Sequence, residues 1–167
     1  MIRDATAADV SAIALIHVDA LRDTYAGVVP DDYLRALTYR SRAAMWRRAI
    51  ERARGFVLVA DDGGGVLGFA SGGSGRDVTI PFDGELYAIY LRPDRLRRGL
   101  GTALLRAAAS RLAERGLTSM YAMVLAANPA CRFYEALGGE RFVRKTIEIG
   151  GAALDEVAYV WPELPSC

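Results

Sequence analysis

Residues 85–102 read Glu85-Leu-Tyr-Ala-Ile-Tyr-Leu-Arg-Pro-Asp-Arg-Leu-Arg-Arg-Gly-Leu-Gly-Thr102, and the fold can be worked out from this stretch. It begins with strand-like alternation and then turns at Pro93 and Asp94. Residues 100–115 follow, with apolar residues at helical spacing and no proline. A strand, a turn and a helix N-terminus in this order present free backbone N–H groups to an anion. The stretch therefore predicts a phosphate-binding turn.

The glycines and arginines of the turn suit this prediction. Gly99 and Gly101 have no Cβ, so a ligand can lie directly against the main chain. Arg95, Arg97 and Arg98 add positive charge beside it. An ordinary strand–loop–helix joint with exposed arginines is the alternative.

The spacing disfavours two other phosphate-binding motifs. A P-loop needs a lysine directly after its second glycine, and the only lysine of the chain is Lys145. A Rossmann fingerprint needs a third glycine three places after Gly101, where the sequence has Leu104. Binding of ATP or of a dinucleotide is therefore disfavoured.

The composition is typical of a single globular domain. The chain has 167 residues, of which 52% are hydrophobic, and a formal net charge of +1. We therefore expect one well-buried domain over residues 1–167. Because the charges balance, neither nucleic acid nor a membrane surface is expected as a partner.

The chain has few residues that could bind a metal. Cys131 and Cys167 make no disulfide framework, and neither has metal-ligand spacing with His17, the single histidine, so no metal is expected. His17 lies within a predicted helix, where a structural role is favoured. No secretory segment and no apolar run of about 20 residues occurs, so a cytoplasmic protein is expected.

Alternation, helical spacing and turn residues place the remaining elements. Thr6 and Asp9 resemble a capping box at the first helix, and Ser41 is expected to cap the third. The order indicates one α/β domain with a mixed sheet and helices on both faces. We expect strands at residues 2–3, 56–61, 66–70, 85–91, 119–125, 141–149 and 153–160, and helices at 6–24, 33–37, 41–54, 100–115 and 129–137.

A second informative stretch runs from Asn128 to Gly139. Asn128 followed by Pro129 is a helix start, with an Asx N-cap before a proline at the first helical position. Gly138 and Gly139 end this helix after about two turns.

Both stretches resemble signatures of the GNAT superfamily of acyl-CoA N-acyltransferases. Leu96-Arg-Arg-Gly-Leu-Gly101 resembles its pyrophosphate loop, Q/R-x-x-G-x-G/A, with Leu96 in place of the leading Gln or Arg. Residues 128–138 resemble N-x-x-A-x-x-F-Y-E-x-x-G with one residue fewer before the aromatic pair. The element order is also that of the family. The resemblance implies a single-domain GNAT-like fold with a mostly antiparallel central sheet.

The resemblance also implies transfer of an acetyl group from acetyl-CoA to a primary amine by direct attack. A backbone N–H near Ile89 or Tyr90 is then the expected oxyanion donor. A GNAT-fold acyl-CoA-binding or regulatory module without turnover is the alternative. The residues expected to contact the cofactor are Ile89, Tyr90, Leu91, Arg97, Arg98, Gly99, Leu100, Gly101, Thr102 and Asn128.

Two residues are predicted to move protons. Glu85 matches the position of a general base in some members of the family, and would act through a water because Ile89 lies about 13 Å further along the strand. A surface charge at the strand end is the alternative. Tyr134 matches the general acid of the family and would protonate the leaving thiolate; a core tyrosine is its alternative. Alternation predicts that Glu85, Tyr87, Ile89 and Leu91 share one face.

The acceptor is expected to be a small-molecule amine. Tyr25, Tyr33, Trp46 and Tyr87 are the aromatic residues predicted to line its pocket, although core positions are equally consistent with Tyr25, Tyr33 and Trp46. Acidic residues would favour a cation such as a polyamine; they are Asp19, Asp23, Asp31, Asp32, Asp83 and Glu85. An antibiotic or a protein N-terminus remains open as acceptor, and so does a homodimer.

Overall fold

The computed structural model describes residues 1–52 and 54–165. Ala53, within the helix expected at 41–54, and Cys167 lie outside these residues. The strands are β1 (Ile2–Asp4), β2 (Phe56–Asp61), β3 (Val66–Ser74), β4 (Gly84–Leu91), β5 (Met120–Leu125), β6 (Glu140–Ile149) and β7 (Ala152–Trp161). The helices are α1 (Val10–Tyr25), α2 (Asp31–Ala36), α3 (Tyr39–Arg52), α4 (Leu100–Glu114) and α5 (Ala130–Ala136), with 3₁₀ turns η1 (Ala7–Asp9) and η2 (Pro93–Arg95).

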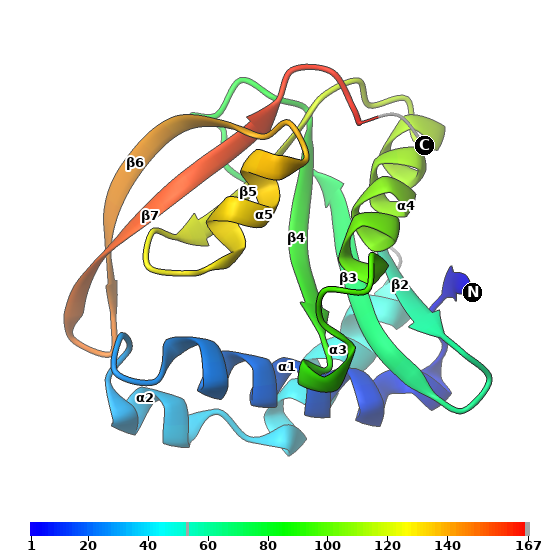
Figure 1. The fold of residues 1–167 in the computed structure, drawn as a ribbon, viewed down its shortest axis with the longest axis vertical. Coiled ribbons are helices and arrows are strands. Elements are labelled where there is room, and N and C mark those ends of the chain that lie inside the picture. The colour runs from blue at the N-terminus through cyan, green and yellow to red at the C-terminus, as the bar shows by residue number, and fades with distance from the viewer. Residues whose placement is uncertain (53, 166–167) are drawn as a thin grey trace.

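The seven strands form one sheet in the order β1-β2-β3-β4-β5-β7-β6. Each neighbouring pair is antiparallel except β4 and β5, which are parallel. In Figure 1, α4 and α5 lie in front of this sheet, whereas α1 and α3 pack with residues of β2 and β3 on the other face. The predicted α/β fold, with a mixed, mostly antiparallel sheet and helices on both faces, is confirmed.

Two core clusters hold the helices against the sheet. On the first face, α4 presents a stripe that includes Leu104, Leu105 and Leu112, all fully buried. Burying each such leucine contributes about 1.5–3 kcal/mol relative to leaving it exposed. On the second face, Ile13 of α1 packs with Trp46 of α3. The phosphate-binding turn therefore leads into a helix that is fixed over the centre of the sheet.

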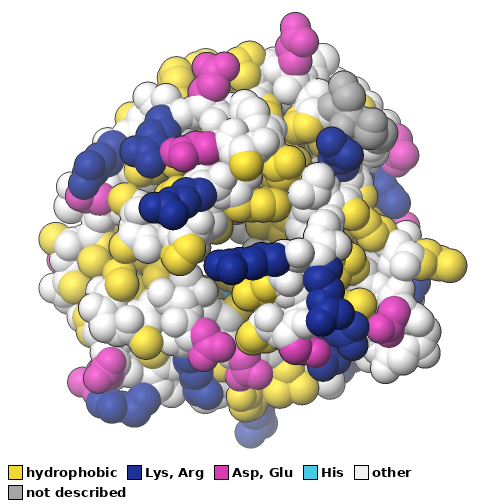
Figure 2. Space-filling model, in the orientation of Figure 1, with side chains coloured by type: hydrophobic (Ala, Val, Ile, Leu, Met, Phe, Trp, Pro, Cys, Tyr) yellow, Lys and Arg dark blue, Asp and Glu magenta, His cyan; other side chains and the backbone are white. Residues whose placement is uncertain are grey.

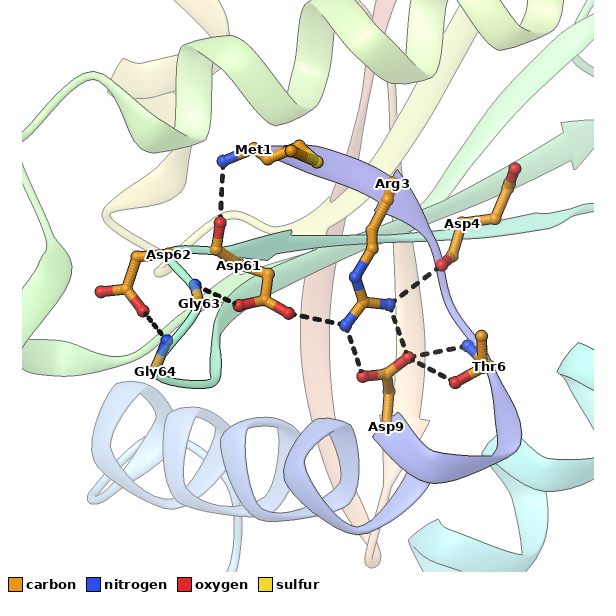
Figure 3. A network of polar contacts seen from close by, with 9 residues as sticks. All are labelled: Met1, Arg3, Asp4, Thr6, Asp9, Asp61, Asp62, Gly63 and Gly64. Atoms are coloured by element: carbon orange, nitrogen blue, oxygen red, sulfur yellow. Dashed lines mark hydrogen bonds and ion pairs between the residues drawn. The ribbon is translucent and has the colours of Figure 1, made fainter.

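Arg3 joins β1 to the start of α1 and to the end of β2. Its guanidinium donates hydrogen bonds to Asp9 at 2.8 and 2.9 Å and to Asp61 at 2.7 Å (Figure 3). Asp9 also accepts from the backbone N–H of Thr6, as the predicted capping box requires, and from the Thr6 hydroxyl. The hydrogen bonds from Arg3 above all hold the pKa of Asp9 well below its usual range.

The start of α3 differs from the prediction. Ser41 was expected to cap this helix, but the helix begins at Tyr39. The hydroxyl of Thr38 accepts the N–H of Ser41 at 3.1 Å, so Thr38 takes the capping position. Both residues are good caps, and the sequence pattern alone did not separate them.

An extra residue interrupts the pairing of β3 with β4. Ser71 is paired with Ala88, whereas the next residue, Gly72, is paired with Leu86. Tyr87 is therefore the additional residue of a β-bulge, which locally increases the twist of the strand.

Because of this bulge, the residues at the end of β4 lie on a different face from the one that simple alternation predicts. Leu86, Ile89 and Leu91 pack on the side of α4, so the alternation changes by one residue after the bulge. Alternation predicted that one face of β4 carries Glu85, Tyr87, Ile89 and Leu91. This prediction is wrong because the bulge shifts the alternation by one residue.

The long β6–β7 hairpin reaches the connection between α1 and α2. It turns at Gly150 and Gly151, whose φ angles of 58° and 84° are left-handed. Ile149 packs near the hairpin tip in a cluster that also contains Tyr25 and Leu34. Figure 1 shows the hairpin curving down to these helices. Its tip and the two helices make the wall of a cavity described below.

Candidate active site

Strands β4 and β5 pair over a short length and then separate. The structure pairs only Gly84 with Met120 and Glu85 with Tyr121, although β4 continues to Leu91. Beyond these pairs, no strand of residues 1–52 or 54–165 lies beside the β5-facing edge of β4. Its backbone N–H and C=O groups can therefore pair with an extended ligand.

The predicted phosphate-binding turn follows directly after this edge. Arg97 has a left-handed φ of 59°, and Gly99 has a φ of 78° as the residue before α4. Within residues 54–165, the backbone N–H groups of residues 97–102 donate to no backbone carbonyl, and the next N–H, of Ala103, donates to Gly99 at 3.0 Å. These successive free donors, at a helix N-terminus, form a site suited to an anion.

Gly101 has a different role from the one expected. A Cβ at Gly101 would come within 3.2 Å of the Phe133 ring, so this side of the glycine faces α5 and not open space. A Cβ at Gly99 would meet nothing within 4 Å, and the positive φ explains the glycine there. Gly101 therefore lets the first turn of α4 pack against Phe133, which fixes the direction of its N–H groups.

Of the arginines of the turn, Arg97 and Arg98 are exposed and Arg95 is half-buried. Among the described residues, the Arg97 and Arg98 side chains make no ion pair or hydrogen bond, whereas Arg95 lies 3.3 Å from Asp94. Leu96 is also exposed, in the position where the family pattern has a polar residue. Figure 2 shows a hollowed, largely hydrophobic surface between β4 and α5, bordered by Lys and Arg side chains.

Tyr134 lies on α5 beside the opening between β4 and β5. Its ring is buried and packs against Phe133, Tyr159 and Trp161, with ring centroids 5.5 to 5.8 Å apart. Its hydroxyl makes no hydrogen bond with any residue that the structure describes. Burial raises the pKa of Tyr134, and the neighbouring phenol of Tyr90 raises it further. The phenol therefore keeps its proton at neutral pH and can donate it to a ligand.

Asn128 connects α5 to α1. Its amide oxygen accepts the backbone N–H of Ala130 at 2.8 Å, so the predicted cap is present. Its amide nitrogen donates to the hydroxyl of Tyr25, also at 2.8 Å. The structure thus shows structural partners for both ends of the side chain that was also expected to contact the cofactor.

A cavity of about 200 Å³ lies between the end of the sheet and the α1–α2 connection. Tyr25, Tyr33 and Tyr90 line it, so two of the four predicted aromatic residues are present. Most of the other lining residues are aliphatic, and one is Glu156 of β7. Besides burial, the nearby phenols of Tyr90 and Tyr25 raise the pKa of Tyr134, so two residues that line the cavity lie close to this phenol.

Trp46 and Tyr87 are not among the residues that line this cavity. Trp46 is buried between α1 and β3 and donates a hydrogen bond to Nδ1 of His17 at 3.0 Å. Tyr87 lies at the bulge, where its hydroxyl donates to the Ser74 carbonyl and its ring lies under the Arg76 guanidinium. Both were expected to contact the acceptor, but core packing and the bulge direct them elsewhere.

Glu85 is buried, and both oxygens of its carboxylate accept hydrogen bonds. Its Oε1 lies 2.7 Å from Nη2 of Arg76, and its Oε2 accepts from the backbone N–H and Nε of Arg76. The hydroxyl of Tyr121 also donates to Oε2 at 2.9 Å. Glu85 is therefore not a surface charge. For Glu85 to act as a base, one of these hydrogen bonds to its carboxylate would have to break.

The acidic residues predicted around the acceptor do not line the cavity. Asp19 accepts from Tyr39, Asp83 accepts from Thr118 and Ser119, and the acidic pair at 31–32 lies in the first turn of α2. The acid that does line it, Glu156, was missed by the sequence prediction. A signal was available, since alternation places Glu156 on the face of β7 that Ala158 and Val160 make apolar.

The comparisons with known proteins agree with this architecture. The family described as Acetyltransferase (GNAT) matches residues 18–139, and the chain therefore belongs to the GNAT family of acetyltransferases. It is 40% identical over 163 residues to an uncharacterised N-acetyltransferase of Bacillus subtilis, covering 98% of this chain and 93% of the relative.

Two further relatives bear on the chemistry. An L-methionine sulfoximine/L-methionine sulfone acetyltransferase of Pseudomonas paraeruginosa is 35% identical over 136 residues, covering 77% of this chain and 73% of that protein. A putative acetyltransferase of Salmonella typhimurium, solved with its cofactor acetyl-CoA, has 26% identity and a TM-score of 0.74. The match covers 100% of this chain and 95% of that one.

Two general properties complete the site description. No helix in residues 1–52 or 54–165 has both the length and the apolar character needed to cross a membrane. In the same residues, no three His, Cys, Asp or Glu side chains are grouped so that they could hold a metal ion.

Proposed function

We propose that this protein transfers the acetyl group of acetyl-CoA to a primary amine. The observation that carries the proposal is the run of free backbone N–H groups at residues 97–102, next to an unpaired strand edge and beside Tyr134. A pyrophosphate needs such donors, and an extended amide-containing chain needs such an edge. Membership of the acetyltransferase family and the acetyl-CoA-bound relative support the same ligand.

In this proposal the turn binds the pyrophosphate mainly through its backbone. Arg97 and Arg98 have no protein partner in the described chain and add charge beside the phosphates. The pantetheine lies along β4 near Ile89 and Leu91, and the thioester reaches the region of Tyr90. A backbone N–H of Ile89 or Tyr90 then donates to the developing oxyanion.

The reaction is a direct displacement. The amine nitrogen attacks the thioester carbonyl, its N–C bond forms, and the C–S bond breaks. Tyr134 donates its proton to the leaving sulfur, for which a buried phenol with a raised pKa and a free hydroxyl is suited. No covalent intermediate on the protein is needed. Cys131 is buried on the helix that carries Tyr134 and has no role in this proposal.

The amine, which is an ammonium ion at neutral pH, must also lose a proton. Glu85 acting through a water is the acceptor predicted from the sequence. Because four donors already engage its two oxygens, the contacts favour the unpaired Glu156 over Glu85.

The test is release of CoA thiol from acetyl-CoA with a panel of primary amines, combined with mass spectrometry of the amine. Thiol released in equal amount to N-acetylated amine supports the proposal. Acetyl-CoA binding by calorimetry without any thiol release would instead indicate a binding or regulatory module with this fold.

A further inference from the structure

Glu156 and the charged pairs whose members act on it do not balance in charge. Arg76 is paired with Glu85 at 2.7 Å, and Lys145 is paired with Asp77 at 2.6 Å. Glu156 makes neither a hydrogen bond nor an ion pair with the rest of the described chain. The group therefore has two cations and three carboxylates, and the carboxylate without a partner is the one that lines the cavity.

The position of Glu156 is fixed by the sheet. It is paired with Leu125 of β5 on one side and with Lys145 of β6 on the other. Because it lies on a central strand, its side chain points either to the α5 face or to the cavity. Its neighbour Val157 packs with the α4–α5 cluster, so Glu156 points to the opposite face, where Tyr25 also contributes to the cavity.

Apart from Glu156, aliphatic side chains and the three tyrosines Tyr25, Tyr33 and Tyr90 line the cavity. Leu21, Val29, Leu34, Leu125 and Ile149 contribute to its wall, and no Lys or Arg is among the lining residues. A ligand with a carboxylate would have no cation to pair with there and would meet Glu156. A ligand with one ammonium group and a hydrocarbon body would satisfy both the charge and the apolar wall.

We propose that Glu156 binds the ammonium group of the acceptor and takes its proton, and that the acceptor is a small apolar primary amine without a carboxylate. The inference rests on the proposed acetyl transfer. It differs from the expectation of a polyamine, because the cavity offers one carboxylate without a partner, and it differs from the amino-acid derivatives named for the Pseudomonas relative.

The ammonium loses one proton to the Glu156 carboxylate, which passes it to solvent, and the neutral amine attacks the thioester. Tyr134 protonates the sulfur, and the second proton lost by the nitrogen replaces the one that Tyr134 has given. Burial raises the pKa of Glu156, Glu85 and Asp77 raise it further, and Lys145 lowers it. Tyr25 also faces Glu156, and the phenols of Tyr33 and Tyr90 line the same cavity.

The first arm of the test compares two acceptors that differ by one group. Isoamylamine and L-leucine share the same hydrocarbon body and amine, but only leucine has a carboxylate. We expect kcat/KM for isoamylamine to exceed that for L-leucine at least about tenfold, because leucine brings a like charge next to Glu156. Spermidine should also be the poorer substrate. Equal or better use of L-leucine or spermidine would overturn the assigned acceptor class.

The second arm uses Glu156→Gln, which keeps the shape of the side chain. We expect kcat/KM for isoamylamine to fall about 10²-fold or more. The rise of kcat/KM with pH that reflects deprotonation of a carboxylate should be absent from the profile of the variant. The melting temperature and the Kd of acetyl-CoA should stay at the parental values. The matched control is Glu148→Gln, an exposed acid on the same hairpin, which should change nothing. Parental activity of Glu156→Gln would refute its role.

A binding measurement separates this inference from the proposed reaction. Isoamylamine is titrated calorimetrically into the parent protein and into Glu156→Gln, each saturated with CoA. Binding that is lost in the variant supports the ammonium site even if no thiol is released, in which case only the acetyl-transfer proposal fails. No difference in binding would overturn the ammonium site.

Discussion

His17 provides a prediction whose size can be worked out from the structure. Nδ1 of His17 accepts the indole N–H of Trp46 at 3.0 Å, so a proton on this nitrogen would face another donor. Burial, followed by the nearby charge of Arg42, lowers the pKa of His17 from 6.5 to about 4. As the pH falls, His17 therefore takes up a proton in the unfolded chain at a higher pH than in the folded chain. The stability that neutral His17 contributes above about pH 6.5 is lost as the pH falls toward 4.

Lowering the pH from about 7 to about 5 should cost about 2 kcal/mol of unfolding free energy through this histidine. Urea unfolding followed by tryptophan fluorescence measures it. His17→Asn is the control, because its amide oxygen can accept from Trp46 but does not titrate. The advantage of the parent over the variant should shrink by this amount between the two pH values. The same pH dependence in both proteins would refute the proposed neutral histidine.

Two further substitutions separate backbone from side-chain roles in the site. Gly101→Val should weaken acetyl-CoA binding by about 1–3 kcal/mol, measured by calorimetry. A Cβ at this position lies 3.2 Å from the Phe133 ring, so the larger side chain displaces the start of α4. Arg95→Ala should cost less than about 1 kcal/mol, because its contact with Asp94 is a surface pair, and equal losses would contradict a backbone cradle. Glu85→Gln should lower the unfolding free energy by about 1–3 kcal/mol in urea, because it weakens the charged hydrogen bonds from Arg76. Unchanged kcat/KM in this variant would remove Glu85 as the base, whereas a loss of about 10²-fold would restore it.

Much of the fold could be predicted because local chemistry and tertiary structure agree. Asn128 and Pro129 specify a helix start whatever lies around them, and the glycines after α5 and in the β6–β7 turn specify ends. The cap of α3 was misplaced by three residues because Thr38 and Ser41 are both good caps. β3 was predicted to end at Ala70, but it runs to Ser74 because its pairing with β4 continues through the glycines.

The site was predictable only in part, because several of its features depend on register. The free N–H groups of residues 97–102 follow from local sequence, but the bulge at Tyr87 depends on how β4 pairs with Gly72. Alternation indicates which face of β7 carries Glu156, but its place at the cavity depends on the insertion of β7 between β5 and β6, which no local pattern reveals. Trp46 was assigned to the acceptor on its type alone, and its partner His17 shows that it is part of the core.

Tyr134→Phe tests the central claim, that acetyl transfer occurs where the opening between β4 and β5 meets the free phenol of α5. The substitution keeps the ring and its contacts with Tyr159 and Trp161, so the melting temperature and the Kd of acetyl-CoA should not change. The measurement is kcat for thiol release with a saturating amine. It should fall about 10²-fold or more, because the leaving thiolate loses its proton donor. Turnover at the parental rate would contradict the account and leave Tyr134 as a core residue.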